Sequence, residues 1–198
     1  MKRVSTKETI IATALELFNE KGSAAVSTNH IADALGISTG NLYYHFKNKE
    51  EIIRAIFLNM VGEMDTAWVI GDESSPTLDD FFNAMTAIQE MLINYRFFQR
   101  ELSTLVFNDP ELAEINKAVR AARFKEIETF FDHLIKSGAI RKPEDEHTLL
   151  CLIRTGWLIG DYWLDYLSIE GSALNKKNIG EGVDLIREII RPYLVESA

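Results

Sequence analysis

The chain has 198 residues, of which 46% are hydrophobic and 26% charged, with four prolines and eleven glycines. This composition allows one or two domains with a hydrophobic core and excludes a disordered, collagen-like or low-complexity protein. The net charge of −9 argues against a protein that coats nucleic acid along its whole length, and the single cysteine, Cys151, excludes an intramolecular disulfide.

Charge is unevenly distributed along the chain. Residues 1–49 carry six basic and four acidic side chains, whereas residues 50–198 carry fifteen basic and twenty-six acidic ones. The difference indicates that a polyanion would meet only the first segment, although chance scatter of surface charge explains the same numbers. The first residues lack a secretory apolar run and the most apolar stretch, 149–167, contains charges, so we expect a cytoplasmic chain with no membrane span.

Apolar residues recur at helical spacing in nearly every segment, which predicts an all-α chain of about nine helices. Ser5 and Glu8 form a capping box at the start of the first helix, and Gly22 ends it. The second and third helices are expected over 27–36 and 38–45. The fourth is expected to begin after Asn48 and to extend to about residue 68.

Prolines indicate the starts of the later helices. Pro76 suits the first position of the fifth helix, which follows a polar loop over 71–75. Pro110 gives the same signal for a long helix that ends near Gly138, and Pro143 opens another that extends to about residue 167. A last helix is expected over 179–194.

The second and third helices form a helix-turn-helix motif. They are joined by Leu35-Gly36-Ile37-Ser38, in which the glycine permits a left-handed turn. The second helix of such a pair enters the DNA major groove with its N-terminal residues first. Gly40 would let the backbone approach DNA, while Thr39 and Asn41 offer hydrogen bonds to base edges. Further donors that would position the duplex surround this helix: Tyr43, Tyr44, His45 and Lys49.

The same region carries a long gapless pattern: Ile31-Ala32, then Leu35-Gly36-Ile37-Ser38, Gly40, Leu42-Tyr43-Tyr44-His45-Phe46 and Asn48-Lys49-Glu50. This pattern resembles the DNA-binding signature of the tetracycline-repressor (TetR) family of bacterial regulators, over residues 6 to about 53. The resemblance implies an N-terminal three-helix helix-turn-helix domain over 1–49 and a helical-bundle effector-binding and dimerisation domain over 50–198. It also implies a set of DNA contacts: Thr28, Asn29, Thr39, Gly40, Asn41, Tyr43, Tyr44, His45 and Lys49.

Four of these residues also have a purely structural interpretation. Tyr43 suits core packing between the first and third helices, and Tyr44 suits a solvent-exposed aromatic position. His45 has the alternative of a structural histidine, and Lys49 that of an ordinary surface charge.

A homodimer is expected because a helix-turn-helix protein that reads two half-sites of DNA needs a two-fold partner. The last two long helices are the candidates for the interface, as in the proteins that this chain resembles. The candidate interface residues are Gly156, Gly160, Trp163, Leu167, Ile186 and Ile190. Packing in the protomer's own core is the alternative, and both can hold on different helix faces.

The fifth to seventh helices have an aromatic and methionine-rich interior, and the family resemblance implies a small, largely apolar effector there. The candidate pocket residues are Phe81, Met85, Ile88, Tyr95, Phe98, Phe124, Phe131 and Trp157. Ordinary core packing is the alternative for this stripe. Three arginines are candidates to hold an anionic ligand, with a solvated surface as the alternative: Arg96, Arg100 and Arg123.

Other classes of function have less support. His147 and Cys151 have a spacing that suits a metal, but no third ligand accompanies them, so neither a metal nor a cofactor is expected. The patterns of nucleophilic, zinc-dependent and nucleotide-binding enzymes do not occur, so we expect no enzyme. A helical-bundle protein–protein adaptor would not need Gly40, Lys49 and the aromatic pair beside a turn.

We therefore predict a transcriptional repressor that binds a pseudo-palindromic double-stranded DNA operator as a homodimer. Binding of the effector between the fourth and eighth helices would swing the fourth helix like a lever. The spacing of the two recognition helices would then no longer fit the two half-sites.

Overall fold

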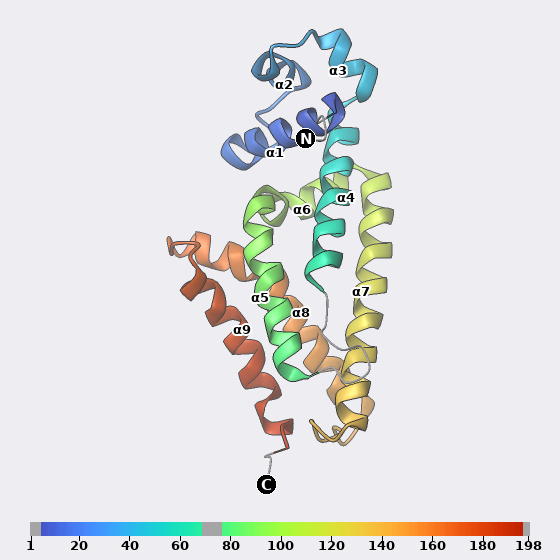
Figure 1. Cartoon of the computed structure of the whole chain (residues 1–198), viewed down its shortest axis with the longest axis vertical. Coiled ribbons are helices and arrows are strands. Elements are labelled where there is room, and N and C mark those ends of the chain that lie inside the picture. The colour runs from blue at the N-terminus through green and yellow to red at the C-terminus, as the bar shows by residue number, and fades with distance from the viewer. Residues whose placement is uncertain (1–4, 69–76, 196–198) are drawn as a thin grey trace. The chain divides into compact units, whose positions relative to one another are not determined.

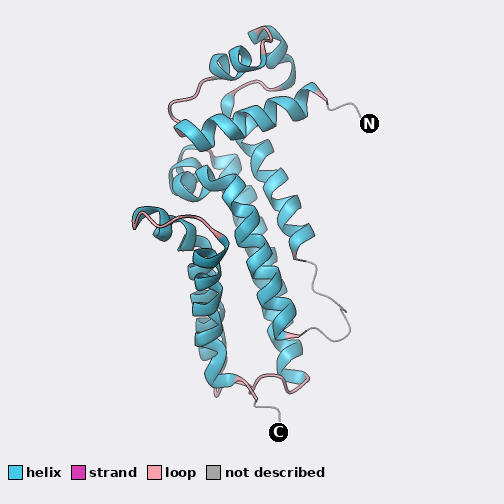
Figure 2. Cartoon of the chain, turned by 60° about the vertical axis from the view of Figure 1, so that its left-hand side comes forward, coloured by secondary structure: helices cyan, strands magenta, loops and turns pink. Residues whose placement is uncertain are grey.

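Well-placed caps and helical periodicity produce helices along most of the chain (Figure 1). The computed structural model describes residues 5–68 and 77–195, and Figure 2 shows helices joined by loops within them. This confirms the all-α class. The nine α-helices of the described residues are α1 (Thr6–Lys21), α2 (Thr28–Leu35), α3 (Thr39–His45), α4 (Lys49–Ala67), α5 (Leu78–Leu92), α6 (Arg96–Asn108), α7 (Pro110–Lys136), α8 (Glu146–Ile169) and α9 (Lys176–Ile190).

Side-chain caps decide where several helices begin. Ser5 caps α1 through the expected capping box. α8 starts three residues after Pro143 because the Asp145 carboxylate accepts a hydrogen bond of 2.7 Å from the Thr148 N–H. That bond also holds the pKa of Asp145 below its ordinary value. Asn175 caps α9, which therefore begins earlier than periodicity alone indicates. The expected start at Pro76 and the loop over 71–75 lie outside the described residues.

The chain folds into two compact units. The first contains Met1–Glu63 and Asn94–Glu114, and the second contains Met64–Ile93 and Ile115–Ala198. These bounds differ from the predicted division after residue 49, because most of α4 packs in the first unit, where the rings of Phe57 and Phe98 lie 5.6 Å apart. The division of functions between residues 1–49 and 50–198 stays a prediction.

The core of the first unit joins its small N-terminal helices to α6. Ile10 of α1, Ile31 of α2 and Leu42 of α3 are all fully buried. Behind them, the side chain of Asn19 donates a hydrogen bond of 2.6 Å to the Asn94 carbonyl and accepts one of 3.1 Å from the N–H of Phe97. This buried amide is therefore satisfied, and it ties the end of α1 to the start of α6.

The second unit packs α5, α8 and α9 side by side, as Figure 1 shows. A buried hydrophobic cluster of this unit consists of Phe81, Phe82, Ile127, Phe130, Phe131, Leu134, Ile140, Ile153, Val183, Ile186 and Ile190. α8 and α9 approach closely at Gly182, where a Cβ atom would lie 2.5 Å from the indole ring of Trp163. No helix of the described residues is both long and apolar enough to cross a membrane.

We expect Gly182→Ala to destabilise the protein, because the added methyl group would force the Trp163 ring or α9 to move. Overpacking of this kind costs about 1–3 kcal/mol of unfolding free energy, which urea denaturation would measure. Gly180→Ala is the matched control, since nothing lies within 4 Å of its added Cβ, and the better helix propensity of alanine should stabilise the chain by up to ~1 kcal/mol. Equal midpoints for the two variants would contradict this packing.

Candidate nucleic-acid interface and ligand cavity

The turn of the helix-turn-helix motif has the geometry that its sequence predicts. Gly36 adopts a left-handed conformation with φ of 65°, and the N–H of Ile37 donates to the Ala32 carbonyl at 3.1 Å. Ser38 then begins α3, because its hydroxyl accepts a hydrogen bond of 3.2 Å from the N–H of Asn41. Leu42 is the buried residue of α3, so the opposite side of the helix faces outward.

All nine predicted DNA contacts lie at the surface of the first unit. Three are partly buried, Thr28, His45 and Lys49, and the others are exposed: Asn29, Thr39, Gly40, Asn41, Tyr43 and Tyr44. Tyr43 is 48% exposed, which argues against core packing, and its hydroxyl lies 3.1 Å from that of Thr28. Tyr44 is 86% exposed, as its alternative interpretation also requires, and its ring lies edge-on to that of His45 with the centroids 5.1 Å apart.

Lys49 has an internal partner that the sequence did not indicate. Its ammonium donates a hydrogen bond of 2.7 Å to the carbonyl of Ser23, leaving the other hydrogens for an outside partner. Lys47, which sequence reasoning missed, lines the same surface depression as Thr28, Tyr43 and Lys49, and it is exposed. Its position two residues before Lys49, in a basic turn, is the signal that would have made it a candidate DNA contact.

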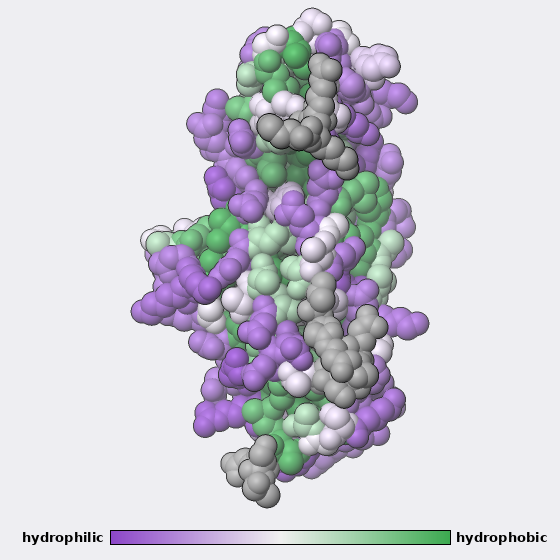
Figure 3. Space-filling view, in the orientation of Figure 1, coloured by the Kyte–Doolittle hydropathy of each residue, from purple (hydrophilic) through white to green (hydrophobic). Residues whose placement is uncertain are grey.

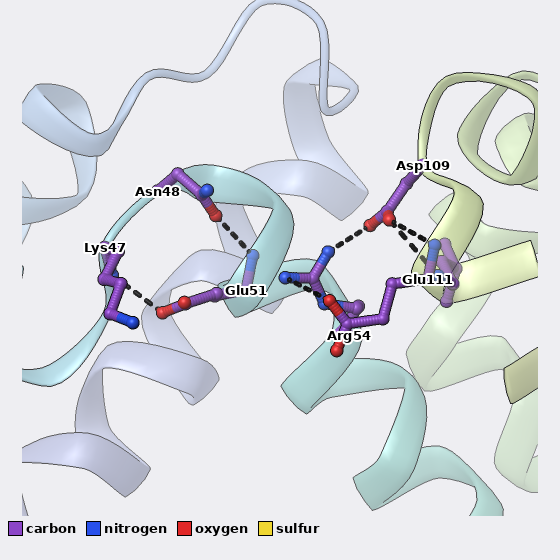
Figure 4. Close-up of polar contacts among 7 residues, drawn as sticks. Lys47, Asn48, Glu51, Arg54, Asp109 and Glu111 are labelled. Carbon is purple, nitrogen blue, oxygen red and sulfur yellow. Dashed lines mark hydrogen bonds and ion pairs between the residues drawn. The ribbon is translucent and has the colours of Figure 1, made fainter.

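A polar network fixes the start of α4 within the first unit (Figure 4). The Glu51 carboxylate accepts from the N–H of Lys47 at 2.8 Å, while the Glu51 N–H donates to the Asn48 side chain at 2.8 Å. One turn later, the Arg54 guanidinium contacts Asp109 at 2.7 Å and Glu111 at 3.2 Å. The buried Asp109 carboxylate also accepts from the first N–H groups of α7, so one side chain joins α4 to the start of α7.

The second unit contains an apolar cavity of about 80 Å³. Five of the predicted pocket residues line it: Phe81, Met85, Ile88, Phe131 and Trp157. Arg123, a predicted candidate for holding an anionic ligand, also lines it. The other residues of its wall were not predicted as pocket residues, and they are Met64, Trp68, Gln89, Leu92, Ile127, Leu152, Ile153, Gly156, Gly160, Asp161, Ile186 and Ile190.

Three predicted pocket residues do not line this cavity. Tyr95 and Phe98 belong to the first unit, because a 3-10 turn over Ile93–Tyr95 breaks the aromatic run. The Tyr95 hydroxyl donates to Glu63 at 2.7 Å, and burial together with this carboxylate raises the tyrosine pKa. Phe124 lines a separate hollow beside Arg120.

The predicted interface residues face the interior of the protomer, which favours the alternative interpretation for them. Gly156, Gly160, Ile186 and Ile190 line the cavity, Leu167 is buried, and the Trp163 ring packs over Gly182. Other large apolar side chains of α8 and α9 are exposed instead: Leu158, Tyr162, Tyr166, Ile169 and Leu185. Figure 3 shows a hydrophobic patch at the left edge, where Figure 1 places the junction of these two helices.

Two of the candidate anion-binding arginines have partners inside their own unit. Arg100 donates to the Asn19 carbonyl at 3.1 Å, near the C-terminal end of α1, and Arg123 pairs with Asp65 and Glu126. The His147 ring nitrogen lies 3.5 Å from the Cys151 sulfur on an exposed face of α8. No group of three or more metal-ligating side chains is found in residues 5–68 and 77–195.

Comparisons with known proteins identify the family. A model described as bacterial regulatory proteins, tetR family, matches residues 10–56, and one described as a bacterial transcriptional repressor matches residues 59–198. The chain belongs to the TetR family. As a member of this family it is a DNA-binding transcriptional repressor, and residues 10–56 contain the helix-turn-helix motif described above.

Individual TetR-family proteins agree with this assignment. The repressor KstR2 of Rhodococcus jostii is 30% identical over 153 residues, which cover 73% of each chain. The crystal structure of a TetR-family regulator from Marinobacter aquaeolei is 32% identical and covers 98% of this chain and 93% of its own, with a TM-score of 0.87. The class C tetracycline repressor of Escherichia coli is 42% identical over 50 residues, which are 25% of this chain and 23% of that protein.

We expect Arg54→Met to lower the free energy of unfolding by about 1–3 kcal/mol, because it leaves the buried Asp109 carboxylate without its cationic partner. Glu111→Gln is the control, since the Glu111 side chain is 68% exposed and its loss should cost less than ~0.5 kcal/mol. Chemical denaturation of both variants measures the difference. A larger decrease in unfolding free energy for Glu111→Gln than for Arg54→Met would show that the pair of Arg54 and Asp109 is not the stabilising contact.

Proposed function

We propose that this TetR-family protein represses transcription as a cytoplasmic homodimer that binds a pseudo-palindromic operator and responds to a small, largely apolar effector. We also propose that it catalyses no reaction, since its relatives are transcriptional regulators. The observation that carries the DNA-binding part is the outward face of α3, where Thr39, Gly40 and Asn41 are exposed while Leu42 is buried.

The chemistry of this face suits the DNA major groove. Asn41 can form paired hydrogen bonds with adenine, and Gly40 offers no side chain to keep the helix backbone from the duplex. Around them, Tyr44, His45 and Lys47 present donors suited to phosphates, which fix the position of a protein on DNA without reading its sequence. The residue roles assigned here remain part of the proposal.

The exposed apolar side chains of α8 and α9 support a dimer through these helices. Leu158, Tyr162 and Ile169 recur on α8 at spacings that keep them near one face, and Leu185 adds an exposed position on α9. Two copies of this face, related by a two-fold axis, would bury the apolar side chains and present two copies of α3.

Helix α4 provides a route from the effector to DNA. It is a continuous helix that starts at Lys49, shortly after α3, and contains Met64, which lines the cavity. An effector that displaces Met64 therefore acts on the same helix that follows the recognition helix. A coupling of about 1–3 kcal/mol lowers operator affinity 5–150-fold.

Selection of random DNA duplexes by the purified protein tests this function. We expect enrichment of an inverted repeat whose half-sites lie about one helical turn apart. Enrichment of a single half-site would contradict the dimer, and failure to retain any duplex at low salt would contradict the assigned role of α3.

We expect Asn41→Ala to relax the base preference at one position of each half-site, by about 1–3 kcal/mol, because its side chain would read a base edge. Competition between the selected duplex and single-base variants measures this change. Asn108→Ala, an exposed asparagine on α6, is the control and should leave every preference unchanged. An unchanged preference in Asn41→Ala would show that this side chain reads no base.

We expect Lys47→Ala to weaken binding to all duplexes by a similar factor and to reduce the slope of log affinity against log salt by about one unit, because it removes one phosphate contact. Lys49→Ala should do the same and also destabilise the fold, since the Ser23 carbonyl loses its donor. Lys125→Ala, on α7, is the control for both variants. If neither Lys47→Ala nor Lys49→Ala changed the slope of log affinity against log salt, these lysines would not contact the DNA phosphates.

A further inference from the structure

The cavity of the second unit contains a buried acceptor without a partner. Gln89 of α5 is 3% exposed and lines the cavity. Its Nε2 donates a hydrogen bond of 2.6 Å to the Gly160 carbonyl. Because a carbonyl only accepts, this bond fixes the orientation of the amide and leaves Oε1 unpaired among the described residues. Such an acceptor favours a ligand that donates a hydrogen bond.

The charge of Arg123 does not favour an anionic ligand. Arg123 is 8% exposed and lines the same cavity, but Nη1 contacts Glu126 at 2.6 Å and Nη2 contacts Asp65. Two carboxylates thus outnumber its single positive charge. What remains is Nε, a buried donor without a hydrogen-bond partner among the described residues. A neutral oxygen would satisfy this donor without adding a third negative charge.

Among the described residues that line the cavity, no carboxylate is left unpaired to serve as the counter-ion of a cationic ligand. Asp161 is the carboxylate of that wall, and it accepts from Trp157 Nε1 at 2.7 Å and from Arg120 Nη1 at 2.7 Å. The other charged group of the wall is Arg123, whose two carboxylate partners, Glu126 and Asp65, are already paired with it. Burial of an ammonium among apolar side chains without a counter-ion is unfavourable.

We propose that the cavity binds an uncharged, ring-sized apolar molecule with a hydroxyl group that donates to Gln89 Oε1. A hydroxyl both donates and accepts, so it also suits the unpaired Arg123 Nε–H. The cavity volume of about 80 Å³ is roughly half that of a ~150 Å³ cavity that admits benzene in another protein, which limits the buried part to about one ring. The inference rests on the proposed function in taking this cavity as the effector site.

Calorimetric titration of the full-length protein at neutral pH with matched probes tests the inference. The probes are para-cresol, para-xylene, para-toluate and para-methylbenzylammonium, which share a ring and differ in one substituent. We expect para-cresol to bind at least as tightly as para-xylene, although xylene gains more by leaving water, and both charged probes to bind at least about tenfold more weakly than para-cresol. Tighter binding of a charged probe or of xylene, or no binding of cresol up to its solubility limit, would overturn the proposal.

Gln89→Met assigns the selectivity to one side chain, because methionine has a similar length and no acceptor oxygen. We expect the preference for cresol over xylene to fall about tenfold in this variant. Gln99→Met, on α6 of the first unit, is the matched control and should keep the parent preference. An unchanged preference in Gln89→Met would overturn the proposal.

If circular dichroism shows that Gln89→Met is unfolded, titration of the parent protein with para-methylanisole tests the same point. This probe has a methoxy group in place of the cresol hydroxyl and cannot donate a hydrogen bond, so we expect it to bind more weakly than para-cresol. Equal affinities for the two probes would overturn the proposal.

The affinity of the parent protein for its selected duplex, measured with and without saturating para-cresol, separates this inference from the proposed function. Selective cresol binding through Gln89 that leaves DNA affinity unchanged would support the cavity chemistry and contradict the effector role. Normal DNA binding with a preference for a charged probe would overturn the cavity chemistry and leave the DNA-binding role intact.

Discussion

The face of α3 that we propose contacts DNA depends first on the burial of one leucine. α3 has seven residues, whereas an isolated helix needs roughly 12–15 to persist in water. Its position is therefore fixed from outside, by the fully buried Leu42, by the Ser38 cap and by Phe46 at its end. A shift of one residue would rotate the exposed face by about 100° and bury Asn41 in place of Leu42. The core of the first unit thus determines which side chains of α3 face outward.

Two of the arginines that the sequence offers for an anionic ligand, and a further arginine, Arg54, are used inside the protein. Arg100 binds carbonyls near the end of α1, Arg54 neutralises a buried aspartate, and Arg123 is shared by two carboxylates. An arginine presents several donors in a rigid plane, so it suits carbonyls and carboxylates that burial has separated from water. Because the net charge is −9, the DNA contact that we propose would depend on a small local set of cations, of which the exposed Lys47 is one.

The sequence predicted local structure better than it predicted which distant residues lie side by side in the fold. The turn at Gly36, the caps at Ser5 and Ser38 and the all-α class follow from short-range chemistry, and the structure has all of them. The aromatic run from Phe81 to Phe98 looked like one pocket because helical periodicity cannot show that a 3-10 turn sends its two parts to different units. The role of Gln89 could not be predicted for a related reason. The sequence places this glutamine among apolar residues, but only the structure shows that its Nε2 bonds to the Gly160 carbonyl and that its oxygen therefore has no partner among the described residues.

Helix α4 has residues in both units, and the switch that we propose depends on this. Arg54 holds its first half through Asp109, while Met64 in its second half lines the cavity. Backbone hydrogen bonds keep a 19-residue helix stiff, so a change at Met64 is a change of the whole element. A coupling of about 1–3 kcal/mol is comparable with one hydrogen bond to a buried group. A hydroxyl that satisfies Gln89 in only one position of α4 would therefore supply a differential of the required size, without any large rearrangement of the core.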